Sequence, residues 1–190
     1  MGQSRILRFV FLLIACVACG SFATASAEEA PFTLPKRAEL SRIRSAEMTT
    51  SKGTIYFELY PEDAPWHVAN FKFLADKGFY RGLTFHLYLE GYIIQGGAPG
   101  GNPNGGPGYT LPAEFNQYRH EAGTLGMARR PDSVNPERRS NGSQFHILLG
   151  DAPQMNKSYT IFGKVIKGMD VVYKLRPGDR IIDLKVFVKN

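Results

Sequence analysis

The chain has 190 residues and a formal net charge of +6, which fits a single domain with a sizeable core. Its basic side chains are scattered, and no stripe interleaves them with aromatic residues, so nucleic-acid binding is not expected. Both cysteines, Cys16 and Cys19, lie in the first 27 residues. If that segment is removed, the sequence offers no disulfide scaffold, Cys nucleophile or Cys metal site.

Residues 1–27 have the features of a signal peptide. Basic residues precede an apolar run over 9–18 that is too short for an ordinary transmembrane helix, and Ala25-Ser26-Ala27 fits a cleavage site. We therefore expect export, to the periplasm or alternatively to a secretory lumen or the exterior, with no membrane association after cleavage. An uncleaved anchor is one alternative, and a lipid anchor at Cys16 is another, because the residues before it resemble a bacterial lipoprotein box.

The segment after the signal peptide predicts an arm followed by one domain. Residues 28–44 are polar and without a sustained period, so we expect a linker or N-terminal arm before a domain at 45–190. Residues 54–59 alternate apolar and polar side chains, which is the period of a β-strand. The stretch 63–78 predicts an amphipathic helix that Asp63 can cap.

The second half of the chain predicts mainly short strands. Residues 83–95 have the pattern of two strands, and residues 96–108 contain seven glycines and three prolines, which indicates a loop. A short second helix is expected at 168–175. Further strand candidates lie at 123–128, 143–149, 159–166 and 180–190. Many short strands with two helices favour a closed antiparallel barrel over a doubly wound sheet.

Several chemistries are disfavoured by their missing motifs. The four histidines form no HExxH pattern, no serine lies in a GxSxG elbow, and the glycine-rich loop lacks the GK[ST] ending of a phosphate cradle. We therefore expect no metal and no cofactor. What remains is a barrel that binds a ligand or catalyses a reaction that breaks no covalent bond.

Over about residues 46–188 the sequence resembles the cyclophilins. The resemblance rests on four stretches: "GFYRGLTFHLYLEGYIIQGG", "GGPGYTLPAEF", "GTLGMARRPDSVNPERRSNGSQFHI" and "YTIFGKVIKGMDVV". It implies a closed eight-stranded antiparallel β-barrel capped by two α-helices. It also implies peptidyl-prolyl cis-trans isomerase activity on proline-containing segments of unfolded or folded proteins, without a cofactor and with a monomer as the default.

The resemblance also assigns site residues. Tyr92, Gln95 and His146 take catalytic positions, and Leu87 stands where the family has arginine. The substrate-binding positions are Ile93, Met127, Ala128, Arg129, Gln144, Met155 and Tyr159. From the residues alone, plainer readings stay open: Ile93 and Met155 could be core residues, and Tyr92 and His146 could be buried with satisfied hydrogen bonds.

The substitution at Leu87 is chemically severe, because the family arginine is credited with donating to the prolyl nitrogen. Losing a donor that strengthens in the transition state would cost about 2–4 kcal/mol, or about 30- to 1,000-fold in rate. Three outcomes follow: a weakened isomerase, replacement of the donor by Arg129 or Arg130, or a prolyl-peptide-binding chaperone or adaptor without turnover. A barrel that binds a ligand unrelated to proline is a further class.

Overall fold

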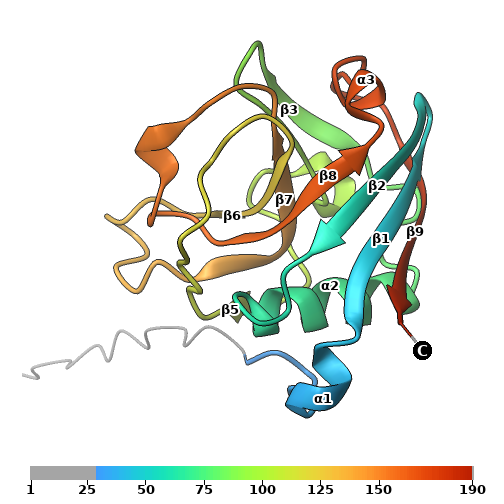
Figure 1. Cartoon of the computed structure of the whole chain (residues 1–190). Helices are drawn as coiled ribbons and strands as arrows, with labels where there is room; N and C mark the ends of the chain where they lie inside the picture. Colours follow the sequence, from blue (N-terminus) through green and yellow to red (C-terminus); the bar gives the residue numbers. More distant parts are fainter. Residues whose placement is uncertain (1–28, 190) are drawn as a thin grey trace, which may run out of the picture.

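The computed structural model describes residues 29–189, so the expected signal peptide and Cys16 lie outside the described residues. Three α-helices and nine strands follow one another along this part of the chain (Figure 1). The helices are α1 (Arg37–Leu40), α2 (Pro65–Asp76) and α3 (Met169–Val172). The strands are β1 (Ile43–Thr50), β2 (Gly53–Leu59), β3 (Phe85–Leu89), β4 (Ile93–Gly96), β5 (Thr110–Leu111), β6 (Thr124–Arg129), β7 (Ser140–Leu148), β8 (Ile161–Lys167) and β9 (Ile181–Val188).

The strands form one curled antiparallel sheet. Their order is β3-β4-β7-β6-β8-β2-β1-β9, with the two-residue strand β5 paired to β7 outside this path. The ends of the sheet meet through a single bridge between Thr84 and Arg180 and a few backbone hydrogen bonds around it. The expected barrel fold is therefore confirmed, although its closure is made by a short contact and not by a full strand ladder.

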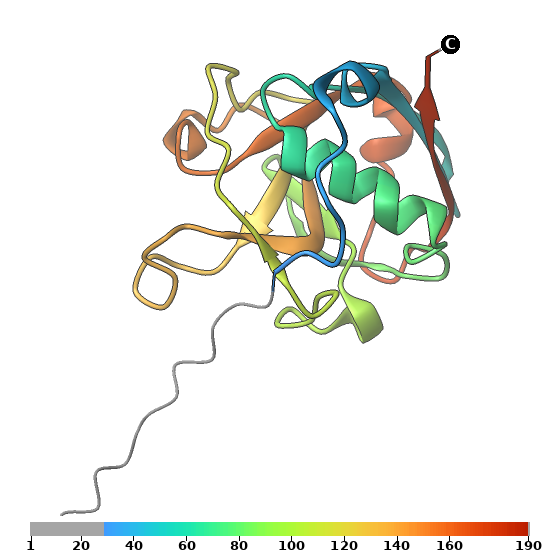
Figure 2. The ribbon, with the colours of Figure 1, turned by 90° about the horizontal axis from the view of Figure 1, so that it is seen from below.

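Alternation along the strands places the core inside this curled sheet. Phe57, Phe145 and Phe162 are fully buried, and the ring of Phe145 lies edge-on to Phe71 of α2. Aromatic rings prefer such edge contacts, because the positive ring edge meets the negative face. The longest helix, α2, covers one opening of the sheet (Figure 2), so its apolar side completes the core.

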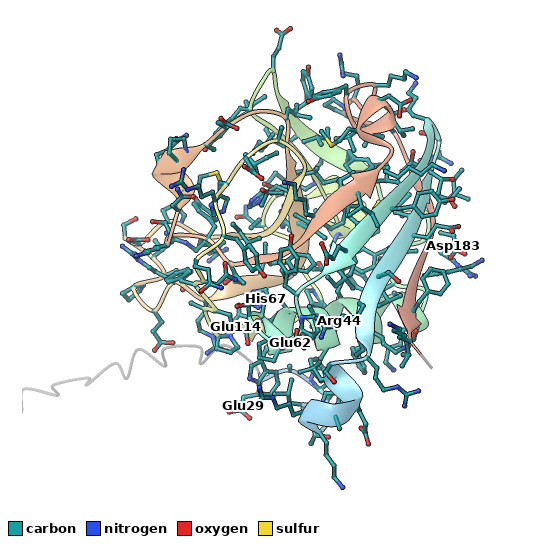
Figure 3. The ribbon with its side chains drawn as sticks, in the orientation of Figure 1. Glu29, Arg44, Glu62, His67, Glu114 and Asp183 are labelled. Carbon is teal, nitrogen blue, oxygen red and sulfur yellow. The ribbon has the colours of Figure 1, made fainter. Side chains whose placement is uncertain are left out.

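The N-terminus of α2 is bound by a residue that lies far away in the sequence. Asp63 was expected to cap this helix, but the N-cap residue is Ala64, which offers no side-chain bond. Instead, the Glu114 carboxylate accepts hydrogen bonds from the backbone N–H groups of Trp66 (3.0 Å) and His67 (3.1 Å). It also contacts His67 Nδ1 at 2.6 Å (Figure 3). A carboxylate satisfies unpaired N–H groups and favours the positive end of the helix dipole.

The N-terminal arm lies on the domain. The ring of Phe32 packs 5.7 Å from Trp66 and 5.0 Å from Phe73, both measured between ring centroids. The buried side chain of Leu40 joins the main core. Strand β1 then begins at Ile43, two residues before the expected domain start. None of the helices in residues 29–189 is long and apolar enough to cross a bilayer.

Candidate active site

The outer face of strands β3, β4, β7 and β6 carries most of the residues that the sequence assigns to the site. Successive side chains of a strand point to opposite faces. Ile94, Phe145 and Ile147 point inward and belong to the main core. Their neighbours therefore point outward, and the strand registers pair Leu87 with Gln95 and Gln95 with His146.

An apolar cluster, which we call the outer cluster, covers this face outside the barrel core. It consists of buried Ile93, Leu148, Ala152 and Met155, with half-buried Leu87, Tyr92 and Tyr159 packed against them. Met155 reaches the cluster from the single-turn 3₁₀-helix Pro153–Met155. The amide of Gln154 in that turn donates to the Tyr92 hydroxyl at 3.3 Å. A proline ring is an apolar group of the kind that such a cluster can bind.

His146 forms the inner border of the outer cluster. Its ring lies edge-on to Tyr159, with 5.9 Å between centroids, and nearly parallel to His120 at 6.3 Å. Gly126 lies opposite His146 in the strand register, and a Cβ at that position would meet His146 Nε2 at 2.4 Å. The imidazole therefore occupies space that only a glycine on the neighbouring strand leaves open.

The two buried imidazoles favour their neutral forms. Burial, together with the smaller effect of the nearby His120, lowers the pKa of His146 from 6.5 to about 3. Burial also lowers the pKa of His120, whose Nδ1 lies 3.1 Å from Asn156 Oδ1. Within residues 29–189, the Nε2 atoms of both rings have no hydrogen-bond partner. A charged imidazole in this position would lose its hydration without compensation.

An amide pair borders the other side of the face. Gln95 Nε2 donates to Gln144 Oε1 at 3.0 Å and lies 3.4 Å from His86 Nε2. Gln144 Nε2 donates in turn to the carbonyls of Pro103 (2.9 Å) and Gly105 (2.6 Å), which fixes the glycine-rich loop. In the described part of the chain, no donor reaches Gln95 Oε1, so this oxygen remains able to accept a bond from a bound peptide.

Arg129 is anchored away from Leu87. Its Nε donates to the Ser158 carbonyl at 2.7 Å, its Nη1 donates to Asp132 at 2.5 Å, and its guanidinium lies 4.8 Å from the Tyr159 ring centroid. Moving this group into the place of the family arginine would break all three contacts. The structure therefore gives no support to Arg129 as a replacement donor. Instead, Arg129 packs against the ring of Tyr159, which is itself a predicted site residue.

Most of the predicted site residues share this face, and one does not. Met127 was expected to bind substrate, but its side chain is fully buried in the main core and pairs in register with Phe145. Its neighbour Ala128 lies on the outer side of the same strand, so strand alternation sends Met127 inward. Sequence reasoning also missed His120, because nothing in its local sequence indicates a neighbour 26 positions away.

The described residues include no group of three or more His, Cys, Asp or Glu side chains placed to hold a metal ion. The face itself presents an apolar surface, an amide oxygen and neutral imidazoles. Such groups can bind a peptide and bias its conformation through differential binding.

Comparisons with known proteins identify the family. Residues 45–185 match the family described as cyclophilin type peptidyl-prolyl cis-trans isomerase/CLD. Peptidyl-prolyl cis-trans isomerase B of Bacillus subtilis is 45% identical over 134 residues, which cover 70% of this chain and 90% of that protein. A peptidyl-prolyl cis-trans isomerase of Helicobacter pylori is 39% identical over 156 residues, covering 80% of this chain and 91% of its own length.

A solved structure supports the same assignment. The crystal structure of a cyclophilin type isomerase from Cryptosporidium parvum has a TM-score of 0.70 and 30% identity, and the match covers 77% of this chain and 99% of that one. A second crystal structure of that protein, in the presence of the dipeptide Ala-Pro, has a TM-score of 0.68. This chain therefore belongs to the cyclophilin family of peptidyl-prolyl cis-trans isomerases.

Proposed function

We propose that this chain accelerates rotation about X-Pro peptide bonds, at a rate reduced by the leucine at position 87. The observation that carries the proposal is the outer cluster beside the free Gln95 oxygen. An amide resists rotation by about 18–20 kcal/mol because its nitrogen lone pair is delocalised. Acceleration needs only that the twisted amide be bound better than the planar one. The outer cluster would hold the pyrrolidine ring while Gln95 accepts a backbone N–H.

The reduction in rate follows from what replaces the family arginine. Leu87 lies opposite Gln95 in the strand register and packs into the outer cluster. Its aliphatic side chain offers no hydrogen-bond donor. Arg129 is held by Ser158 and Asp132. A missing transition-state donor costs about 2–4 kcal/mol. The chain would then retain the part of the acceleration that apolar binding and the amide oxygen supply.

The decisive experiment introduces the missing donor. We expect Leu87→Arg to raise the isomerisation rate of an X-Pro peptide by at least about tenfold, within the range for one such donor. Leu89→Arg is the matched control, because it adds the same side chain two positions along β3 at an exposed site. Exchange NMR of a prolyl peptide measures the rate directly. A high parent rate that Leu87→Arg leaves unchanged would show that another donor already acts.

Binding without turnover is the second candidate, and the anchoring of Arg129 favours it over replacement of the donor by that residue. In that case the parent chain binds a prolyl peptide with no measurable exchange, as a chaperone or adaptor would. The same NMR experiment separates the two, because line shifts report binding and exchange peaks report turnover. Export before either role belongs to the proposal and rests on the sequence of residues 1–27, with periplasm as the first expectation.

A further inference from the structure

A hollow lies beside the amide pair formed by Gln95 and Gln144. Its volume is about 470 Å³, and its lining includes both Gln95 and Gln144, so it adjoins the proposed peptide site. The glycine-rich loop forms one wall, and the segment that follows β6 forms the other. Gln144 Nε2 and Asn141 Nδ2 both donate to the Gly105 carbonyl (2.6 and 3.0 Å), which ties the loop to β7. The hollow is therefore built by the fold and bordered by fixed groups.

The charged side chains that line this hollow are all positive. Three arginines line it, Arg129, Arg130 and Arg139, and its lining contains no Asp or Glu. Asp132 forms ion pairs with Arg129 (2.5 Å) and with the neighbouring Arg138 (2.6 Å). Within residues 29–189, neither Arg130 nor Arg139 forms an ion pair. Two guanidinium groups at the hollow therefore lack a compensating anion in the described part of the chain.

One of these two guanidinium groups is also held in place. Arg139 Nε donates to Thr110 Oγ1 at 2.7 Å, and its Nη2 donates to the Thr110 carbonyl at 3.1 Å. Arg130 is exposed at the rim. A guanidinium whose orientation is fixed loses less conformational entropy when it binds a carboxylate than a free surface chain does. These arginines thus differ from ordinary solvated ones. They line a hollow, Arg139 has a fixed orientation, and neither Arg130 nor Arg139 has an anionic partner in the described part of the chain.

We propose that this hollow receives an acidic side chain of the same peptide whose proline lies on the outer cluster. The inference rests on the proposed function. Gln144 borders the hollow and His146 borders the outer cluster, two positions apart on β7, which corresponds to about 7 Å. An extended peptide advances about 3.3–3.6 Å per residue. The carboxylate therefore belongs to a Glu or Asp about two or three residues from the proline.

The test compares peptides that differ only in one charge. Peptides of equal length carry Glu or Gln at the second or third position before the proline, or at the same positions after it. We expect one Glu placement to bind about fivefold more tightly than its Gln counterpart, the upper effect of an exposed ion pair. This preference should shrink with salt, because the screening length falls from about 30 Å at 0.01 M to about 3 Å at 1 M.

Two variants locate the effect. Arg130→Gln should reduce the Glu-over-Gln preference to below about twofold, since one of the two uncompensated charges is gone. The matched control is Arg180→Gln, which removes the same charge at an exposed position outside the hollow. The control should keep the full preference. A preference that survives both Arg130→Gln and the double change with Arg139→Gln would assign the acidic side chain to another surface.

The failure of this inference can be told apart from failure of the proposed function. If Gln and Glu peptides bind equally at every placement and low salt, while the Gln peptide is still isomerised, the acidic preference is wrong and the isomerase stands. If no prolyl peptide binds or exchanges, both proposals fail together. Binding affinity comes from titration calorimetry and turnover from exchange NMR, so the two results are independent.

Discussion

Replacing His146 by phenylalanine should remove a defined part of the acid sensitivity of this fold. His146 is 1% exposed, and its pKa in the folded chain lies at about 3, below the 6.5 of an unperturbed imidazole. Above pH 6.5 the ring is neutral in both the folded and the unfolded chain. As the pH falls, the unfolded chain takes up a proton that the folded chain excludes, so stability decreases between pH 6.5 and about 3.

The size of the effect follows from the displacement of the pKa. Each pH unit in this window costs about 1.4 kcal/mol for one excluded proton. At about pH 5 the parent chain should therefore have lost about 2 kcal/mol on account of His146 relative to pH 8. The pKa values of His120 and His86 are lowered in the same direction, by burial. They add to the acid sensitivity of both proteins, so the difference between parent and His146→Phe isolates the one ring.

Urea unfolding at pH 8 and pH 5, followed by the fluorescence of the single tryptophan, Trp66, measures this difference. Each protein serves as its own reference at pH 8, so any packing change caused by the larger phenyl ring cancels. We expect His146→Phe to lose about 2 kcal/mol less than the parent. Equal losses, or an NMR titration of His146 near its unperturbed pKa, would refute the assignment of a buried neutral imidazole.

Three further changes test neighbouring features. Gly126→Ala places a Cβ within 2.4 Å of His146 Nε2, and we expect overpacking to lower the free energy of unfolding by about 1–3 kcal/mol in urea. Glu114→Ala leaves the N-terminal N–H groups of α2 without their acceptor. Thermal unfolding should show a loss of about 1–3 kcal/mol, while Glu114→Gln, which keeps an acceptor, should lose less. Met155→Ala removes a buried side chain from the outer cluster. It should weaken prolyl-peptide binding about tenfold in calorimetry, and an unchanged affinity in a folded variant would place the proline elsewhere.

Some site features could be predicted from local pattern alone. Strand alternation by itself separates the outward Gln144 and His146 from the inward Phe145, because side-chain direction in a strand depends only on parity. The second of the paired glycines after Gln95 is required partly by its own backbone angle and partly by a distant segment. Gly97 has φ +85°, and a Cβ there would lie 2.3 Å from the Ser143 carbonyl oxygen. Only glycine adopts such a conformation at so close an approach without strain.

Other features depended on contacts between distant segments. Asp63 was the expected helix cap, yet Glu114, which lies 47 positions after His67 in the chain, provides the carboxylate. His120 reaches His146 in the same way. For Met127 the local pattern was the better guide. It is next to the outward-facing Ala128 on the same strand, so alternation alone places it inside, whereas the family resemblance assigned it to the substrate site. The group that binds the helix N-terminus and the neighbour of His146 were thus both set by contacts between segments far apart in the sequence.

The sequence by itself determined most of the strand and loop pattern, although not strand β1 (Ile43–Thr50). It also determined the family and the absence of a donor at Leu87, because these depend on residue identity and on neighbours in the chain. The tertiary structure alone decided that Arg129 is tied to Ser158 and Asp132, and that Arg130 and Arg139 face a hollow without acidic groups. The physical reason is that charge compensation and desolvation depend on distances in space. Those distances are set only when segments far apart in the sequence pack together.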